Sequence, residues 1–278
     1  MYIFIYIFMQ LKYPIKIDIV SDLHIDQWSS EYEIKYPCGE VAEHPFIFRE
    51  TDADYLIVAG DISDTLEESV KYLNTISKYY NKIFFVDGNH EHTYSHPNIY
   101  SLNYINSFIN NEKIVFLPKK PYRIDDTVIM GVCGWWDYNN RTSELIKENI
   151  DYFDTWIPHL TEHDNITFIN NSCQFAKQEC DYLEECLIKY TKDYSVRNII
   201  VVTHTIPLKR FCNEERMATE FNSGFERLLK YEKISHWIFG HTHDQWNEKY
   251  KGIQFICNSR GRPEDHGIKD YSIKQLVI

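Results

Sequence analysis

Five short segments of the chain combine carboxylate, imidazole and amide side chains at close spacing. They are SDLH at 21–24, GDISD at 60–64, GNHE at 88–91, THT at 203–205 and GHTH at 240–243. These groups offer oxygen and imidazole nitrogen without a thiolate, which suits manganese, iron, zinc, cobalt or nickel better than a structural zinc clamp. The candidate donors are Asp22, His24, Asp61, Asn89, His204, His241 and His243. They exceed what one catalytic ion with an open position needs, and they fit two divalent transition-metal ions that share a bridging carboxylate.

Each of these segments directly follows an apolar, β-branched run. The runs occupy residues 15–20, 55–59, 83–86, 198–202 and 236–239. Their length and their β-branched residues predict buried strands rather than helices. In open α/β sheets, sites form beyond the carboxyl ends of the strands, so we expect these ends to converge on one site. Glycines beside Asp61, Asn89 and His241 permit tight turns where the backbone approaches the ions.

Helical patterns and hairpins lie between the predicted strands. One helix is predicted from Leu66 to Tyr80 after Asp64-Thr65, and a second is expected to open at Pro97. A capping box at 171–174 predicts the start of a third helix. Hairpins are predicted at 122–130 and 250–254, and a last strand at 271–277. The pattern predicts an N-terminal extension at residues 1–14 and a single domain with mixed sheets at 15–278.

Composition limits the partners and the compartment. The formal net charge of −12 repels polyanions, so no non-specific nucleic-acid binding is expected, although metal ions would supply local positive charge for a phosphate. The seven cysteines include no C-x-x-C pair, which predicts free thiols in a reducing, cytoplasmic setting. The apolar stretch before Met9 is too short to span a bilayer, and no membrane span is expected. We expect activity without residues 1–8, and the sequence does not indicate an oligomeric state.

The order of the motifs, from Asp22 to His243, resembles the calcineurin-like metallophosphoesterase superfamily. The resemblance implies an α/β fold, a two-sheet mixed β-sandwich flanked by helices in α-β-β-α layers, with a dinuclear metal site at the sheet ends. It implies one ion held by Asp22, His24, Asp61 and His243. It implies a second ion held by Asp61, Asn89, His204 and His241, so that Asp61 bridges the two.

The resemblance also implies a role for the histidine of the GNHE segment. His90 is similar to the histidine of the family that is no ligand, contacts the phosphate and protonates the leaving oxygen. Asp64 resembles the partner that orients this imidazole, because a catalytic imidazole needs an acceptor to hold it. Glu91 is expected to brace the loop. His92 and His96 have no role in the family and are interpreted as rim or surface residues, with substrate contact as the alternative.

One departure from the family patterns and two further residues bear on the substrate. The segment after Asp61 reads Ile-Ser-Asp-Thr, without the arginine that protein Ser/Thr phosphatases place on the phosphate. The chain is therefore more similar to the small phosphodiesterase-like branch. Arg260 is expected either to reach a phosphate oxygen or to form a surface salt bridge. Trp135 is expected either to form a wall against the substrate or to pack under its loop.

The resemblance implies a dinuclear-metal-dependent phosphodiesterase that acts on a small soluble phosphoester by in-line attack of a metal-bridging hydroxide. A phosphomonoesterase or nucleotide pyrophosphatase with the same site is the alternative enzyme. A scaffold that binds partners without catalysis is the alternative from another class. Such scaffolds usually have eroded ligands, whereas every candidate ligand and His90 are present in this chain.

Overall fold

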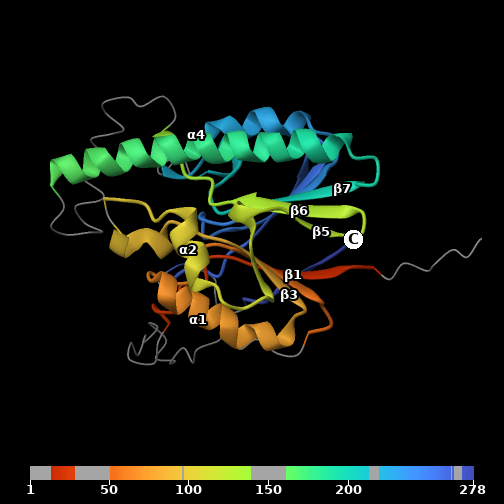
Figure 1. Cartoon of the computed structure of the whole chain (residues 1–278), viewed down its shortest axis with the longest axis horizontal. Helices are drawn as coiled ribbons and strands as arrows, with labels where there is room; N and C mark the ends of the chain where they lie inside the picture. The colour runs from red at the N-terminus through yellow and green to blue at the C-terminus, as the bar shows by residue number, and fades with distance from the viewer. Residues whose placement is uncertain are drawn as a thin grey trace, which may run out of the picture.

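Two mixed β-sheets packed face to face form the centre of the molecule (Figure 1). The computed structural model describes residues 14–28, 51–95, 97–138, 161–212, 219–263, 265 and 271–278. The first sheet has the order β11-β1-β2-β3-β4, with β1 Lys16–Val20, β2 Tyr55–Ala59, β3 Lys82–Val86, β4 Ile114–Phe116 and β11 Lys274–Val277. The second has the order β5-β6-β7-β8-β10-β9, with β5 Tyr122–Ile124, β6 Thr127–Val132, β7 Asn198–Thr203, β8 Ile234–Phe239, β9 Gln245–Tyr250 and β10 Ile253–Asn258.

The interior of each sheet is parallel, and antiparallel strands lie at its edges. In the first sheet β1, β2, β3 and β4 run parallel, and only β11 pairs antiparallel with β1. In the second sheet β6, β7, β8 and β10 run parallel, flanked by antiparallel β5 and β9. The segments that follow parallel neighbours therefore emerge at one edge of each sheet, which is where the predicted donors lie.

Alternation along the strands divides the apolar residues into layers. In β2, Ile57 and Ala59 face the second sheet, where they pack in one cluster with Ile200. Leu56 and Val58 point the other way and pack in the cluster that includes the helix residues of α1. Successive side chains of a strand point to opposite faces, so a continuous apolar run supplies both layers.

Helices cover the outer faces of the sandwich. Helix α1 Leu66–Ile76 lies against the first sheet, and α4 Glu162–Lys192 lies on the opposite side over β6 and β7 (Figure 1). The remaining helices are α2 Leu102–Phe108 and the 3-10 helices η1 Ser77–Tyr79, η2 His90–Ser95, η3 Leu117–Lys119, η5 Lys209–Phe211 and η7 Ser223–Lys230. No helix in the described ranges combines the length and apolar character that crossing a bilayer requires. The α-β-β-α layering expected from the resemblance is confirmed.

The predicted strands and hairpins are confirmed, except that the last strand begins at Lys274 and not at 271. The first predicted helix is α-helical only to Ile76 and continues as the 3-10 helix η1, and two predicted helix starts were wrong. The second helix begins at Leu102 and not at Pro97, because Ser101 caps it and the backbone N–H of Tyr100 donates to His92 Nδ1 at 3.0 Å. The third, α4, begins at Glu162 with a capping box made by Thr161 and Asp164. The segment 171–174 lies inside that helix, since Ser172 Oγ donates to the carbonyl oxygen of Trp136 at 2.8 Å and caps nothing.

Residues 1–13 lie outside the described residues. The division into an extension at 1–14 and one domain at 15–278 therefore stays a prediction.

Candidate metal centre

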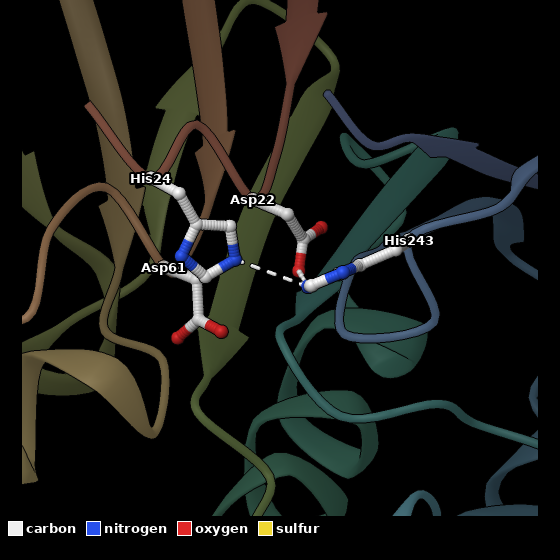
Figure 2. A group of neighbouring side chains, drawn as sticks. All are labelled: Asp22, His24, Asp61 and His243. Carbon is white, nitrogen blue, oxygen red and sulfur yellow. Dashed lines mark hydrogen bonds and ion pairs between the residues drawn. The ribbon is translucent and has the colours of Figure 1, made fainter. Parts of the chain in front are cut away.

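Side chains that follow four strands, two from each sheet, meet in two groups. Asp22, His24, Asp61 and His243 each offer one ligand atom, and these atoms lie within 4.8 Å of one another. Figure 2 shows these four side chains converging from the loops after β1, β2 and β8. A second group with the same spacing contains Asp61, His204 and His241. The Asp61 carboxylate belongs to both groups, the place of a carboxylate that bridges two ions.

In the first group, ring nitrogens face each other and a carboxylate. His24 Nε2 lies 3.0 Å from His243 Nε2, and His243 Nε2 lies 3.8 Å from Asp22 Oδ1. His243 Nδ1 donates to Asp265 Oδ2 at 2.6 Å, so the lone pair of this ring lies on Nε2. The ring nitrogen available as a ligand therefore points into the group.

The second group is arranged in the same way. His204 Nε2 lies 3.0 Å from Asn89 Oδ1, 3.2 Å from Asp61 Oδ2 and 3.2 Å from His241 Nδ1. The outer ring nitrogens donate to backbone carbonyls, His204 Nδ1 to Ala59 at 2.9 Å and His241 Nε2 to Thr219 at 2.9 Å. Such outer hydrogen bonds orient imidazoles for metal binding.

Two buried polar atoms support a fit to cations. Asp22 Oδ2 and His24 Nδ1 are buried and have no hydrogen-bond partner among the described residues. A buried carboxylate oxygen without a partner is costly, and a bound cation would remove that cost. The donor set of oxygen and imidazole nitrogen suits divalent transition metals.

In the protein without ions, the Asp61 carboxylate and the His204 imidazole shift each other's pKa. Burial acts to raise the pKa of Asp61, yet His204 and His90 hold that pKa well below its usual value. Burial acts to lower the pKa of His204, but the adjacent Asp61 raises it to about 10. Burial and then His204 lower the pKa of His241 to about 3. His204 thus holds a proton that an ion would displace, so metal uptake would release protons.

The backbone at the site is left-handed at five of the seven candidate donors. The φ angles are 50° at Asp22, 41° at His24, 54° at Asp61, 72° at His241 and 57° at His243. Non-glycine residues rarely adopt these angles, and such strain concentrates at functional sites. It turns successive donor side chains toward one point directly after each strand.

Two glycines allow the loops to approach this closely. At Gly60, whose φ is +80°, an added Cβ would lie 2.6 Å from His204 Nδ1. At Gly88, an added Cβ would lie 2.1 Å from Asp61 Oδ1. Only glycine fits where the loop packs on a donor side chain.

Glu91 braces the loop after β2, as expected. Its carboxylate accepts from the backbone N–H groups of Asp61 at 3.1 Å, Ile62 at 2.7 Å and Gly88 at 2.7 Å, and from Ser69 Oγ at 2.8 Å. Glu91 is 1% exposed, so water cannot replace its carboxylate as the acceptor for these donors.

We expect Glu91→Gln to lower the free energy of unfolding by about 2–3 kcal/mol, because an amide NH₂ would face groups that are themselves donors. Urea titration of the metal-free protein measures this without a contribution from bound ions. Glu232→Gln, at an exposed position, is the matched control. Equal midpoints for the two variants would contradict the bracing role.

His90 stands beside the two groups, between a carboxylate and an arginine. Its Nδ1 lies 2.5 Å from Asp64 Oδ1, and Arg262 Nη2 lies 3.0 Å from its Nε2. The same Nε2 lies 3.8 Å from Asp61 Oδ2. His24, Asp64 and His90 also lie within 4.8 Å of one another, so the metal content of His90 variants separates a ligand from a proton donor.

The model of the calcineurin-like phosphoesterases matches residues 15–245, most of the chain. The chain belongs to this family. It is a metal-dependent phosphoester hydrolase, and the family uses two divalent metal ions, for which the Asp and His groups are the candidate ligands.

Similar proteins cover nearly the whole phosphoesterase chain. Uncharacterized protein L509 of Acanthamoeba polyphaga mimivirus is 26% identical over 250 residues, 82% of this chain and 86% of the viral protein. The phosphopantetheinyl hydrolase PptH of Mycobacterium tuberculosis has a TM-score of 0.64 at 16% identity, covering 95% of this chain and 96% of that one. A dimetal phosphatase of Danio rerio has a TM-score of 0.59 at 12% identity, covering 94% and 91%. At these identities the two solved structures show the fold alone.

In the phosphoesterase Trp135 takes the second of its two expected positions, whereas the surface role predicted for His92 was wrong. Trp135 is 1% exposed and packs against His92 and Phe168, so it lies under its loop and forms no wall. His92 is also 1% exposed, and its Nε2 lies 2.7 Å from Asp87 Oδ2, so it is a buried, paired residue rather than a rim residue. His96 lies outside the described residues.

Arg260 occupies neither of the two positions expected for it. It is 0% exposed, its guanidinium lies 4.1 Å above the Trp28 ring, and Nη1 donates to the carbonyl oxygen of Leu23 at 3.3 Å. Its backbone N–H donates to Ser21 at 3.0 Å. Arg260 therefore braces the loop that carries Asp22 and His24, and it forms no surface ion pair.

Two residues near the site escaped the sequence interpretation, since Arg262 contacts His90 and Asp265 contacts His243. The Trp136 ring, next to Trp135, stacks on His241 with centroids 5.4 Å apart. Arg262 lies two residues beyond Arg260, so the segment that contains Arg260 was the feature of the sequence that could have indicated Arg262. Nothing in the spacing indicates which of the two arginines faces the site.

Proposed function

We propose that this phosphoesterase is a phosphodiesterase that acts on a small phosphoester with two divalent ions. The proposed ligands are Asp22, His24, Asp61 and His243 for one ion, and Asp61, Asn89, His204 and His241 for the other. The observation that carries the proposal is the sharing of Asp61 by two donor groups beside an oriented imidazole. Manganese is the ion proposed for assays, because the proposed ligands combine carboxylate and amide oxygens with imidazole nitrogens.

When bound, two such ions supply an activated water and polarise the phosphoryl oxygens. The oxygen of that water forms the new bond to phosphorus while the bond to the leaving oxygen breaks in line. His90 donates the Nε2 proton to the leaving oxygen, and Asp64 holds the ring through Nδ1. No covalent bond to the protein is needed.

A diester is favoured by the charge of the site. Three carboxylates, Asp22, Asp61 and Asp64, together with two divalent ions would leave a small positive charge at the reacting position, which matches the single negative charge of a phosphodiester better than the nearly two charges of a monoester. The chain also has no arginine in the Ile62-to-Thr65 segment, where protein phosphatases place one.

Rates on bis(p-nitrophenyl) phosphate and p-nitrophenyl phosphate, with manganese added to metal-free protein, test this function. We expect faster hydrolysis of the diester. Faster hydrolysis of the monoester would establish the phosphomonoesterase alternative. If the enzyme hydrolyses neither ester and no member of a panel of nucleotide sugars and cyclic nucleotides, the scaffold alternative would be favoured.

We further propose a cytoplasmic, reducing setting. The described cysteines Cys133, Cys173, Cys180, Cys186, Cys212 and Cys257 are free thiols.

A further inference from the structure

Arg262 brings a guanidinium to the position that faces the proposed proton donor. Its Nη2 lies 3.0 Å from His90 Nε2. Arginine offers only donors and Asp64 accepts from Nδ1 of the same ring, so Nε2 accepts in this contact and can give a proton only after Arg262 has moved away and Nε2 has taken one up from solvent. The nitrogen that is proposed to protonate the leaving oxygen is thus covered by an arginine in the protein without substrate.

The guanidinium is not fully satisfied by the protein. Arg262 Nε is buried and has no hydrogen-bond partner among the described residues. A buried guanidinium nitrogen without an acceptor is unfavourable, so an anionic ligand would improve this arrangement. The carboxylates of the site, including Asp61 and Asp64, attract cations, and an anion is expected to bind there only when cations are bound as well.

Arg262 is placed to contact the leaving group of the substrate. Once Arg262 Nη2 has left His90 Nε2 and this nitrogen has taken up a proton from solvent, the leaving oxygen takes the place of Nη2 and accepts that proton. The backbone N–H of Arg262 stays anchored to Asp265 Oδ2 at 2.6 Å, so the displaced guanidinium remains next to the leaving group.

We propose that Arg262 binds an anionic group carried by the leaving group, and that the enzyme prefers phosphodiesters whose leaving alcohol carries a phosphate or a carboxylate. This inference rests on the proposed function, since it uses His90 as the proton donor. Arginine suits the role because its planar fork binds phosphate and carboxylate oxygens in pairs.

The anchor makes substitution of the side chain practicable. The contact with Asp265 uses the backbone N–H, which every residue except proline retains. Arg262→Ala and Arg262→Lys therefore keep the loop attached near His243, which Asp265 also contacts. Arg197→Ala is the matched control, because Arg197 precedes β7 at the end opposite His204 and its side chain is 81% exposed.

The test uses two methyl phosphodiesters, one with a p-nitrophenyl and one with an m-carboxy-p-nitrophenyl leaving group, which differ by one carboxylate. We expect the wild-type enzyme to prefer the carboxylated ester in kcat/KM. Arg262→Ala should lose ~10- to 100-fold on that ester and no more than about threefold on the plain one. Arg262→Lys should fall between, Arg197→Ala should match the wild type, and metal content should be unchanged in all variants.

An equal loss on both esters, or no preference in the wild type, would overturn the inference while leaving the hydrolase assignment intact. Absence of turnover of both esters by wild-type enzyme that holds two ions would overturn the proposed function, and this inference with it.

Discussion

Replacing His90 by alanine is expected to leave both metal ions bound and to lower kcat by about 10²–10⁴ for an alkyl leaving group. The ring lies outside the two donor groups that share Asp61, so its removal should not release an ion. An alkoxide leaves poorly without a proton, and His90 is the residue proposed to supply it.

The size of this loss should depend on the leaving group. A p-nitrophenolate departs without a proton, so His90→Ala should lose much less on aryl esters than on alkyl esters. Asp64→Asn should give a milder form of the same pattern, since Asp64 Oδ1 only holds the ring through Nδ1. The measurement is metal stoichiometry together with rates on matched alkyl and aryl diesters.

His204→Ala is the control for the His90 variants. Its Nε2 faces Asn89 and Asp61 within the second group, so this variant should lose metal and activity together on every ester. Loss of an ion from His90→Ala, or an equal rate loss on both kinds of ester, would make His90 a ligand, as its proximity to His24 and Asp64 allows.

Replacing Asp61 by asparagine is expected to weaken both metal sites at once. Asp61 is 1% exposed and is the residue common to both donor groups. An amide carries no charge to offset two cations, so the effect on metal affinity should exceed the ~10- to 100-fold typical of changing a residue that only orients a ligand. Metal content after dialysis measures it, and kcat should fall in parallel.

Asp265→Asn is the matched comparison, because Asp265 is no candidate ligand and reaches the site through His243 Nδ1 and the backbone N–H of Arg262. It should weaken metal binding less than Asp61→Asn does. Two tightly bound ions retained by Asp61→Asn would remove this carboxylate from the bridging position.

The sequence by itself determined the strands and the kind of chemistry that follows them. Runs such as 55–59 and 198–202 are apolar on both faces, which only a strand buried between two layers tolerates, and both are strands of the two sheets. Polar residues directly after parallel strands must emerge at one edge, so the meeting of Asp61 with His204 followed from the pattern.

Only the tertiary structure decided which neighbouring side chain faces the site. Arg260 and Arg262 are two residues apart in one irregular segment, yet the first packs over the Trp28 ring and the second contacts His90. No periodicity governs such a loop, because its side-chain directions depend on the particular φ angle of each residue and on long-range contacts such as that of Asp265 with His243. The left-handed backbone at Asp22 and four other donors is likewise imposed by the packed loops, since local preference opposes it at each non-glycine residue.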